Sequence, residues 1–404
     1  MNRGLFLLWG GVLAGLVMMA LLVYFSLSLP EISPGTLTYF ERSQVEQGRD
    51  YAQLRYISFA AGQMLTLLVL SAAVIFFLHH GRVPPVTANP YLQVMVYAIL
   101  LSVLLAVITL PIDFYRGFVL EHRFGFSTQS LGAWTADYGM RFVINTLMTA
   151  VLLGGLYLVL RNLPLHWPVA GAVAFTLFLA LQAWLGPLFI DPLFHKFEPL
   201  PAGPFKDRVV ELAAGADIKV DNVLVMDASR RTTKANAYFT GVGRTKRIVF
   251  YDNLLRDFSQ REAELVVAHE IGHWKHRHIT LGMLLGAAGA LVFFLLYRQV
   301  TAGYGTPAGH PSAVPLFLLF MTVFSLLIMP VQNAVSRSFE RQADRASIVL
   351  TGDAAGAAAM TAKLAAGNLA DVQPHPFVRL LLFTHPPTVE RITAFEKMAG
   401  REEL

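Results

Sequence analysis

Long apolar stretches alternate with polar segments along the whole chain. Seven stretches come close to the roughly 20 residues that a helix needs to cross the hydrocarbon core of a membrane. They run approximately over residues 5–29, 57–78, 91–111, 142–160, 168–190, 279–297 and 314–335. The first is too long for the apolar part of a signal peptide and precedes a poor cleavage site, so we interpret it as a retained span. The pattern therefore predicts an α-helical polytopic membrane protein with seven transmembrane helices.

The polar segments divide the chain into four regions. A five-span membrane region over 1–190 is followed by a polar insertion over 191–278, a transmembrane hairpin over 279–336 and a C-terminal region over 337–404. No repeat of 20–50 residues is visible, so a solenoid or propeller is not expected. We predict that the insertion folds as a small α+β unit.

Local patterns inside the insertion support that prediction. "FKDRVVELAAGA" has helical apolar spacing and ends in glycine, whereas "VDNVLVMD" is a short β-rich run. "KANAYFTGVGRTKRIVFYD" contains two β-prone runs around a glycine-containing turn, which is typical of a hairpin. Ser259 and Glu262 have the spacing of a capping box, which predicts that a helix begins there and runs through His273.

Composition agrees with a membrane protein and excludes several other classes. Hydrophobic residues make up 55% of the chain and charged residues 15%, against about 25% charged residues in ordinary soluble domains. The absence of cysteine excludes disulfides, thiolate metal sites and a cysteine nucleophile. The formal charge of +5 comes without a basic patch interleaved with aromatic residues, so nucleic acid is not an expected partner.

The distribution of basic residues predicts the orientation in the membrane. If the N-terminus lies outside, the outer segments contain only four of the 32 lysines and arginines, namely Arg3, Arg82, Arg161 and Arg298. Basic residues favour the cytoplasmic side of a membrane. Seven spans then place the C-terminus, and both ends of the last transmembrane hairpin, on the cytoplasmic side of a plasma membrane.

The stretch "HEIGH" carries the clearest candidate chemistry. His269 and His273 are four residues apart, so they project from one face of a helix and can bind one metal ion. Glu270 lies beside such an ion, where it can take a proton from water. The alternative is a purely structural pair of histidines. The neighbouring His276 and His278 are expected to lie on a solvated basic face.

A third ligand distinguishes these alternatives, because catalytic zinc usually has three protein ligands. A histidine six residues after His273 is absent, since that position is Ile279. Glu340 and Asp344 in "FERQAD" are one helical turn apart, just after the seventh span. If the last two spans form an antiparallel hairpin, Glu340 meets the histidines on one side of the membrane. Glu340 is then the predicted third ligand, and Asp344 is expected to hold the second nitrogen of a ligand histidine. The alternative is a solvated charged face.

These motifs resemble those of the integral-membrane CAAX prenyl endopeptidases, which are zinc metalloproteases of the gluzincin type. The resemblance covers most of residues 35–400. It includes "DFYRGFVLEHRFGFSTQSLGAW", "IDPLFHKFEPLP", "KANAYFTG", "HEIGHWKHRH", "FERQAD" and "THPPTVERI", in the family's order and spacing. It implies seven helices around a water-filled chamber, with one Zn²⁺ near the cytosolic end. The absence of an ER-retrieval signal favours a prokaryotic homologue.

The resemblance also implies roles for residues outside the metal motif. Asn236, with Ala237 and Tyr238 in the same segment, is implied to bind the substrate, and His385 and Arg391 are implied to complete the site. A physical argument agrees for Asn236, because an edge strand can pair with an extended peptide.

The sequence therefore predicts a zinc endopeptidase that hydrolyses peptide bonds near the C-terminus of CAAX-type substrates, with or without a prenyl group. One alternative is a membrane-protein quality-control protease of the HtpX type. Another, from a different class, is a zinc transporter or metal-binding membrane receptor. The sequence leaves the native substrate and the oligomeric state open.

Overall fold

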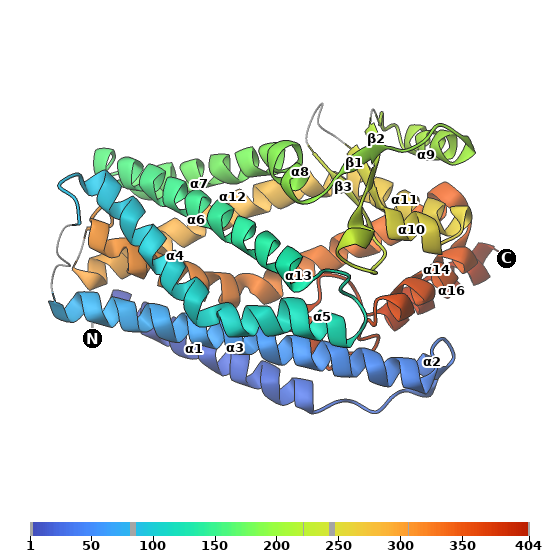
Figure 1. Cartoon of the computed structure of the whole chain (residues 1–404), viewed down its shortest axis with the longest axis horizontal. Coiled ribbons are helices and arrows are strands. Elements are labelled where there is room, and N and C mark those ends of the chain that lie inside the picture. Colours follow the sequence, from blue (N-terminus) through green and yellow to red (C-terminus); the bar gives the residue numbers. More distant parts are fainter. Residues whose placement is uncertain (1–2, 81–85, 221, 242–246, 306, 403–404) are drawn as a thin grey trace.

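The computed structural model describes residues 3–80, 86–220, 222–241, 247–305 and 307–402. Within these residues, seven helices are long and apolar enough to cross a membrane, which confirms the predicted fold class. They lie side by side along the long axis of the molecule (Figure 1). They are α1 (Arg3–Leu27), α3 (Arg42–His80), α4 (Pro90–Phe114), α6 (Leu131–Asn162), α7 (Trp167–Leu185), α12 (His278–Tyr304) and α13 (Val314–Thr351). Their buried side chains, among them Leu67, Phe294 and Leu319, form one hydrophobic core.

Several helices continue well beyond the apolar stretches that predicted them. Helix α3 begins at Arg42 rather than near residue 57, and α13 runs on to Thr351. Hydropathy marks only the part of a helix that crosses hydrocarbon, whereas the backbone hydrogen bonds continue through the polar residues that follow. Position 336, the predicted boundary of the C-terminal region, therefore lies inside α13. The division of the chain into four regions stays a prediction.

Two of the membrane helices end in a wide turn on the side where the polar insertion begins. Helix α4 passes through the π-helical turn η1 (Tyr115–Val119) into α5 (Leu120–Arg123). Helix α7 passes through the π-helical turn η2 (Gly186–Ile190) into α8 (Asp191–Phe194). Such turns are frequent at functional sites, and both lead directly into segments that contact the insertion.

The insertion contains the predicted small sheet. Its four strands are β1 (Phe197–Pro199), β2 (Asn222–Met226), β3 (Ala237–Thr240) and β4 (Arg247–Tyr251), in the spatial order β1-β2-β4-β3. Strands β3 and β4 pair antiparallel, so the predicted hairpin is confirmed, although its turn at 242–246 lies outside the described residues. The predicted helix before the sheet is α9 (Pro204–Ala214). Strand β3 is at the edge of the sheet.

A second hydrophobic core joins the insertion to the C-terminal region. It lies at the end of the molecule where the C-terminus is found (Figure 1). The helices around it are α9, α10 (Asp252–Asp257), α11 (Gln260–Lys275), α14 (Ala354–Gly367), α16 (Thr388–Glu402) and the last turns of α13, whereas α15 (Pro376–Leu382) packs against the first core. Phe250, Val267 and Phe395 are among its buried residues. Because both regions share this core, the metal motif in α11 is held rigidly against α13.

Candidate metal centre

Helix α11 begins at the predicted capping box. The Ser259 side chain accepts a hydrogen bond from the backbone N–H of Glu262, and the Glu262 carboxylate accepts one from the backbone N–H of Ser259. Arg261 adds an ion pair of 2.9 Å with Asp353, which follows α13. These contacts satisfy the free N–H groups of the helix start and fix the first turn of α11 against α13.

The two helices approach each other most closely at Gly272. A β-carbon at this position would lie 2.9 Å from both the Cα and the carbonyl oxygen of Ala343, which are backbone atoms that cannot move aside cheaply. Gly272 lies between the two motif histidines in the sequence, one residue before His273. The absence of a side chain therefore brings His269 and His273 within reach of α13.

We expect that Gly272→Ala separates the two helices and weakens metal binding, although alanine by itself favours a helix by about 1 kcal/mol over glycine. Metal stoichiometry and the melting temperature of the purified protein measure both effects. Gly282→Ala is the matched control, because a β-carbon there meets nothing within 4 Å. If both variants bind metal like the wild type, the close approach does not position the site.

The predicted ligands come together at this contact. Ligand atoms of His269, His273 and Glu340 all lie within 4.8 Å of one another, in a group that could hold a metal ion. The Nε2 atoms of the histidines are 3.2 Å apart, and they lie 3.1 Å and 3.5 Å from the Glu340 carboxylate oxygens. His269 and Glu340 are buried, and Glu340 Oε2 has no hydrogen-bond partner among the described residues. Two imidazoles and one carboxylate with an unsatisfied buried oxygen fit a divalent metal.

Asp344 lies beside the outer nitrogen of His269. Its Oδ1 lies 2.9 Å from His269 Nδ1, and Arg391 donates to both carboxylate oxygens at 2.9 Å and 2.7 Å. Burial lowers the pKa of His269, but the Asp344 and Glu340 carboxylates outweigh it and raise this pKa to about 10. Burial also lowers the pKa of Arg391, and Asp344 raises it above its ordinary value. A neutral His269 binds a metal through Nε2 with its remaining proton on Nδ1, the nitrogen beside Asp344.

Glu270 lies at the junction of α11 and the edge strand. Desolvation raises the pKa of its carboxyl group, and the Glu340 carboxylate adds to this effect, whereas His269 and His273 oppose it. The backbone N–H of Phe239 in β3 donates a hydrogen bond to the carboxylate. The Phe239 ring also packs on Trp274, with ring centroids 3.6 Å apart. A proton-accepting group is thus tied directly to strand β3.

Strand β3 is an edge strand, so the outer side of its backbone has no partner strand, and Ala237 on it is buried. The Tyr251 N–H donates to the Asn236 carbonyl at 3.0 Å, so Asn236 and Tyr251 form a hydrogen-bonded pair. Because such pairs alternate along antiparallel strands, the backbone N–H and C=O groups of Ala237 and Phe239 point away from β4. Asn236 is exposed, whereas the hydroxyl of Tyr238 lies 3.9 Å from Met226 Sδ. An edge strand of this kind is the element to which an extended peptide adds.

His385 reaches the centre from the loop between α15 and α16. Its Nε2 lies 3.1 Å from Glu340 Oε2, and 53% of its side chain is exposed. Two residues of α13 that sequence reasoning did not assign hold this loop. The Arg337 guanidinium donates to the carbonyl of Phe383 at 2.6 Å, and Asn333 donates to that of Leu381 at 2.5 Å. The sequence does show an arginine, Arg337, three residues before Glu340, which could have pointed to a role near the site. Its charge suggested a solvated face instead, and its burial is visible only in the structure.

The expectation for His278 was wrong. This residue is 5% exposed, and its Nδ1 lies 3.0 Å from the Nδ1 of His273. The sequence "HWKHRH" is rich in charged and polar residues, which suggested solvation. The chain instead turns sharply at Arg277, whose φ of 56° is in the left-handed region, and this turn directs His278 inward. His276 is exposed as expected.

The segment before β3 is clamped to the membrane helices. The Lys234 ammonium group donates to Glu121 Oε2 at 2.7 Å and to the Tyr51 hydroxyl at 2.6 Å. Burial lowers the pKa of Lys234, and Glu121 opposes this shift. Arg231 forms a two-pronged ion pair with Asp137 at 2.7 Å and 3.0 Å. Helices α3, α5 and α6 thus hold the segment that leads into the edge strand.

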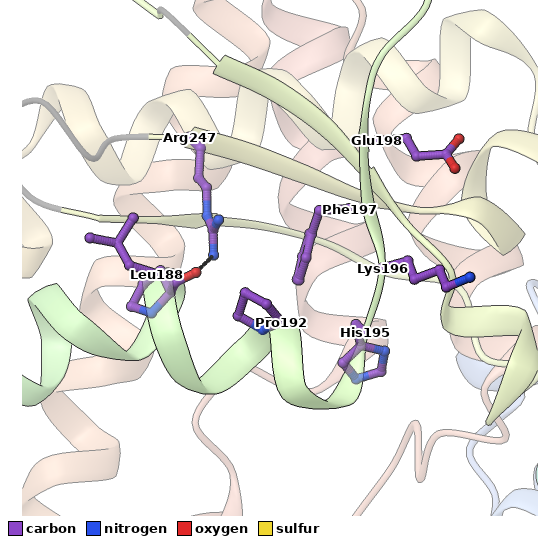
Figure 2. Close-up of a pocket in the computed structure, with 8 residues that line it drawn as sticks. Leu188, Pro192, His195, Lys196, Phe197, Glu198 and Arg247 are labelled. Carbon is purple, nitrogen blue, oxygen red and sulfur yellow. Dashed lines mark hydrogen bonds between the residues drawn. The ribbon is translucent and has the colours of Figure 1, made fainter.

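A hollow of about 510 Å³ lies where the fifth span meets the sheet. Arg247 points from β4 toward the turn that carries Leu188, where it donates to the carbonyl of Pro187 at 2.5 Å (Figure 2). Its guanidinium carbon lies 5.0 Å from the centre of the Phe197 ring. We interpret this cluster as the joint that attaches the sheet to the fifth span.

A larger cavity of about 760 Å³ lies between α7, α12 and α13. Its lining is mostly apolar and includes Phe293, Phe324 and three glycines of α12, Gly282, Gly286 and Gly289. A β-carbon on any of these glycines would meet nothing within 4 Å, so the missing side chains leave the cavity open. The lining also contains His278 and Phe339, which adjoin the predicted ligands His273 and Glu340.

Comparisons with known proteins agree with this geometry. Residues 199–399 match the model of peptidase family M48, and residues 35–196 match that of the CAAX prenyl protease N-terminal region with five membrane helices. CAAX prenyl protease 1 of Saccharomyces cerevisiae is 31% identical over 333 residues, covering 75% of this chain and 72% of that protein. An uncharacterized metalloprotease of Bacillus subtilis, YhfN, is 32% identical over 325 residues, covering 78% and 75%.

The fold is also that of a solved structure. The crystal structure of S. mikatae Ste24p superimposes with a TM-score of 0.85 at 24% identity, covering 98% of this chain and 100% of that one. The two family models together cover both the membrane helices and the metal motif. The chain is therefore a membrane metalloprotease that belongs to peptidase family M48, together with the CAAX prenyl proteases.

Proposed function

We propose that this protein is a zinc endopeptidase that cleaves peptide bonds near the C-terminus of CAAX-type substrates. The observation that carries the proposal is the convergence of His269, His273 and Glu340 within 4.8 Å, beside a strand with a free edge. The names of the relatives, CAAX prenyl protease 1 and its homologues, supply the substrate class.

His269, His273 and Glu340 would hold the zinc ion, with Asp344 and Arg391 orienting His269. Bound zinc polarises the scissile carbonyl and lowers the pKa of a coordinated water toward ~7. Glu270 takes the proton of the attacking water and then passes it to the leaving amine. Its place beside the ligand histidines, where the Phe239 backbone N–H holds the carboxylate, suits this role.

The remaining predicted residues act on the substrate. The edge strand β3 pairs with the extended peptide, and the exposed Asn236 side chain binds it beside this edge. His385, close to Glu340 and half-exposed, donates a hydrogen bond to the carbonyl oxygen as negative charge develops. Removing one such donor typically costs about 10²- to 10³-fold in rate.

One experiment tests this function against its nearest alternative. The purified enzyme is offered a farnesylated CAAX peptide, its unmodified twin and a misfolded membrane protein. We expect cleavage of the CAAX peptides near their C-terminus. Degradation of the misfolded protein alone would instead favour a quality-control protease of the HtpX type. A zinc transporter is less compatible with ligands that lie at the inner ends of helices, and zinc flux into liposomes without peptidase activity would support it.

We further propose that the apolar cavity of about 760 Å³ holds a prenyl chain while the peptide lies at the metal. Its mostly apolar lining and the lining residues that adjoin the predicted ligands support this role. Each buried CH₂ group contributes about 0.8 kcal/mol, so a chain of this kind gains substantial affinity from such a lining.

Gly286→Leu tests the cavity by filling it. Because a β-carbon at Gly286 meets nothing within 4 Å, the variant is expected to fold. We expect KM for the farnesylated peptide to rise about 10-fold or more, since several CH₂ groups lose their contacts, with no change for the unmodified twin. Gly10→Leu, on α1 and equally unhindered, is the control. Equal effects on both peptides would place the prenyl chain elsewhere.

We also propose that the N-terminus lies outside the plasma membrane and the metal centre on its cytoplasmic side. The chain has no cysteine, so single cysteines report orientation without background. Leu165 and Val349 are both 77% exposed, near opposite ends of the spans. An impermeant maleimide should label Leu165→Cys in intact cells and Val349→Cys only after permeabilisation. The reverse pattern would invert the topology.

A further inference from the structure

His278 is a buried imidazole that the proposed mechanism leaves without a role. It is the first residue of α12, the sixth membrane span, and it is 5% exposed. Its ring stacks on Phe339, with centroids 4.2 Å apart and planes 8° from parallel. Phe339 directly precedes Glu340, so His278 lies in the wall of the metal centre.

The contact between His278 and His273 determines which nitrogens carry protons. The Nε2 of His273 faces the other ligands, 3.2 Å from His269 Nε2 and 3.5 Å from Glu340 Oε1. The Nδ1 of His273 is 3.0 Å from the Nδ1 of His278. A neutral imidazole that binds metal through Nε2 carries its proton on Nδ1. His273 must therefore donate this proton, and His278 Nδ1 is the atom positioned to accept it.

The two ligand histidines thus have different partners. The outer nitrogen of His269 lies 2.9 Å from a carboxylate oxygen of Asp344, whose charge is matched by Arg391. His273 has a neutral imidazole instead, placed by the first turn of a membrane helix. Ligand histidines usually donate their second N–H to a neighbouring acceptor, which fixes the orientation of the ring.

We propose that His278 is a positioning residue that accepts the Nδ1–H of His273 and thereby holds this ligand in its metal-binding tautomer and orientation. The proposal rests on the assignment of His273 as a metal ligand in the proposed function. It ties the metal centre directly to the start of the sixth span, so that the geometry of one ligand depends on where α12 begins.

Two substitutions of equal polarity separate this role from packing. His278→Asn places its amide oxygen where the imidazole Nδ1 lies, whereas His278→Gln places its amide group near the position of Nε2. We expect His278→Gln to lower zinc affinity by about 10- to 100-fold, the usual effect of losing such a partner, and His278→Asn to stay within about 3-fold of the wild type. His276→Asn, at the exposed neighbouring histidine, should not differ from the wild type.

Zinc affinity is measured on the full-length protein in detergent by competition with a chromogenic chelator, alongside the melting temperature of the metal-free form. This readout does not depend on peptidase activity, so a failure of the proposed substrate class leaves it intact. Rescue by asparagine but not glutamine supports the proposal. Equal zinc affinity of His278→Asn and His278→Gln would overturn the proposal, whether both are near the wild type or both are weak. A role in packing alone does not depend on whether the amide group lies at the position of Nδ1 or of Nε2.

Discussion

Glu270→Gln is expected to lower kcat/KM for a CAAX peptide by about 10²- to 10⁴-fold while the protein still binds one zinc ion per chain. Glutamine keeps the size of the side chain and can still contact the Phe239 backbone, but it cannot accept a proton from water. The ligand atoms of His269, His273 and Glu340 are untouched. Activity on the peptide and zinc content by elemental analysis measure the two halves of this prediction.

A matched control uses another carboxylate of the same helix. Glu264 is one of the buried residues of α11 and forms ion pairs with Arg208 and Arg261 rather than with the metal ligands. Glu264→Gln should therefore retain most of the activity, with a lower melting temperature as its main effect. Clear cleavage by a preparation of Glu270→Gln free of wild-type enzyme would contradict the role of Glu270 as the proton acceptor.

Glu340→Ala is expected to abolish both zinc binding and peptidase activity. It removes the only carboxylate among the three predicted ligands, and the two remaining histidines do not make a catalytic zinc site. Removing a residue that only hydrogen-bonds a metal ligand typically weakens zinc binding about 10- to 100-fold. Removing the ligand Glu340 itself should therefore weaken zinc binding by more than about 100-fold. Chelator competition on the purified protein measures this affinity.

Arg341→Ala is the control for Glu340→Ala, because Arg341 is the next residue of α13 and is exposed. It should bind zinc like the wild type. If Glu340→Ala also keeps one tightly bound zinc ion, the third ligand is a different residue and the assignment of the metal centre is wrong.

Much of this architecture could be predicted because each helix that crosses a membrane needs about 20 consecutive apolar residues, which are visible in the sequence. The seven apolar stretches correspond to seven long helices among the described residues, and the order of the last two predicts that Glu340 lies on the same side as His273. Local spacing was sufficient for the capping box at Ser259 and for the shared face of His269 and His273. These features depend on short-range periodicity and on the number of membrane crossings.

Other features depend on contacts between distant segments, and sequence patterns do not encode these directly. His278 and Arg337 are both buried, although the residues around them are charged or polar. Their burial follows from the turn at Arg277 and from the path of the loop that carries His385. The position of His385 beside Glu340 was likewise expected only through resemblance to a known family, because 44 residues of intervening chain fold back to bring them together.

The position of α11 explains why a peptidase can be built at the end of a membrane helix. Helix α13 crosses the membrane and continues far enough to supply Glu340 and Asp344. Gly272 allows α11 to lie directly against it, and α12 begins at His278, beside the ligand His273. The candidate metal centre therefore combines two histidines of α11, the last helix of the insertion, with Glu340 of α13, the helix that carries the seventh span.

The most direct test titrates zinc into protein from which metal has been removed. Peptidase activity on a CAAX peptide should be absent at first, rise in proportion to added zinc and reach its maximum at one ion per chain. His273→Ala should remain inactive throughout the same titration. Full activity in the metal-free protein, or restoration of the His273→Ala variant by stoichiometric zinc, would show that this centre does not carry out the hydrolysis.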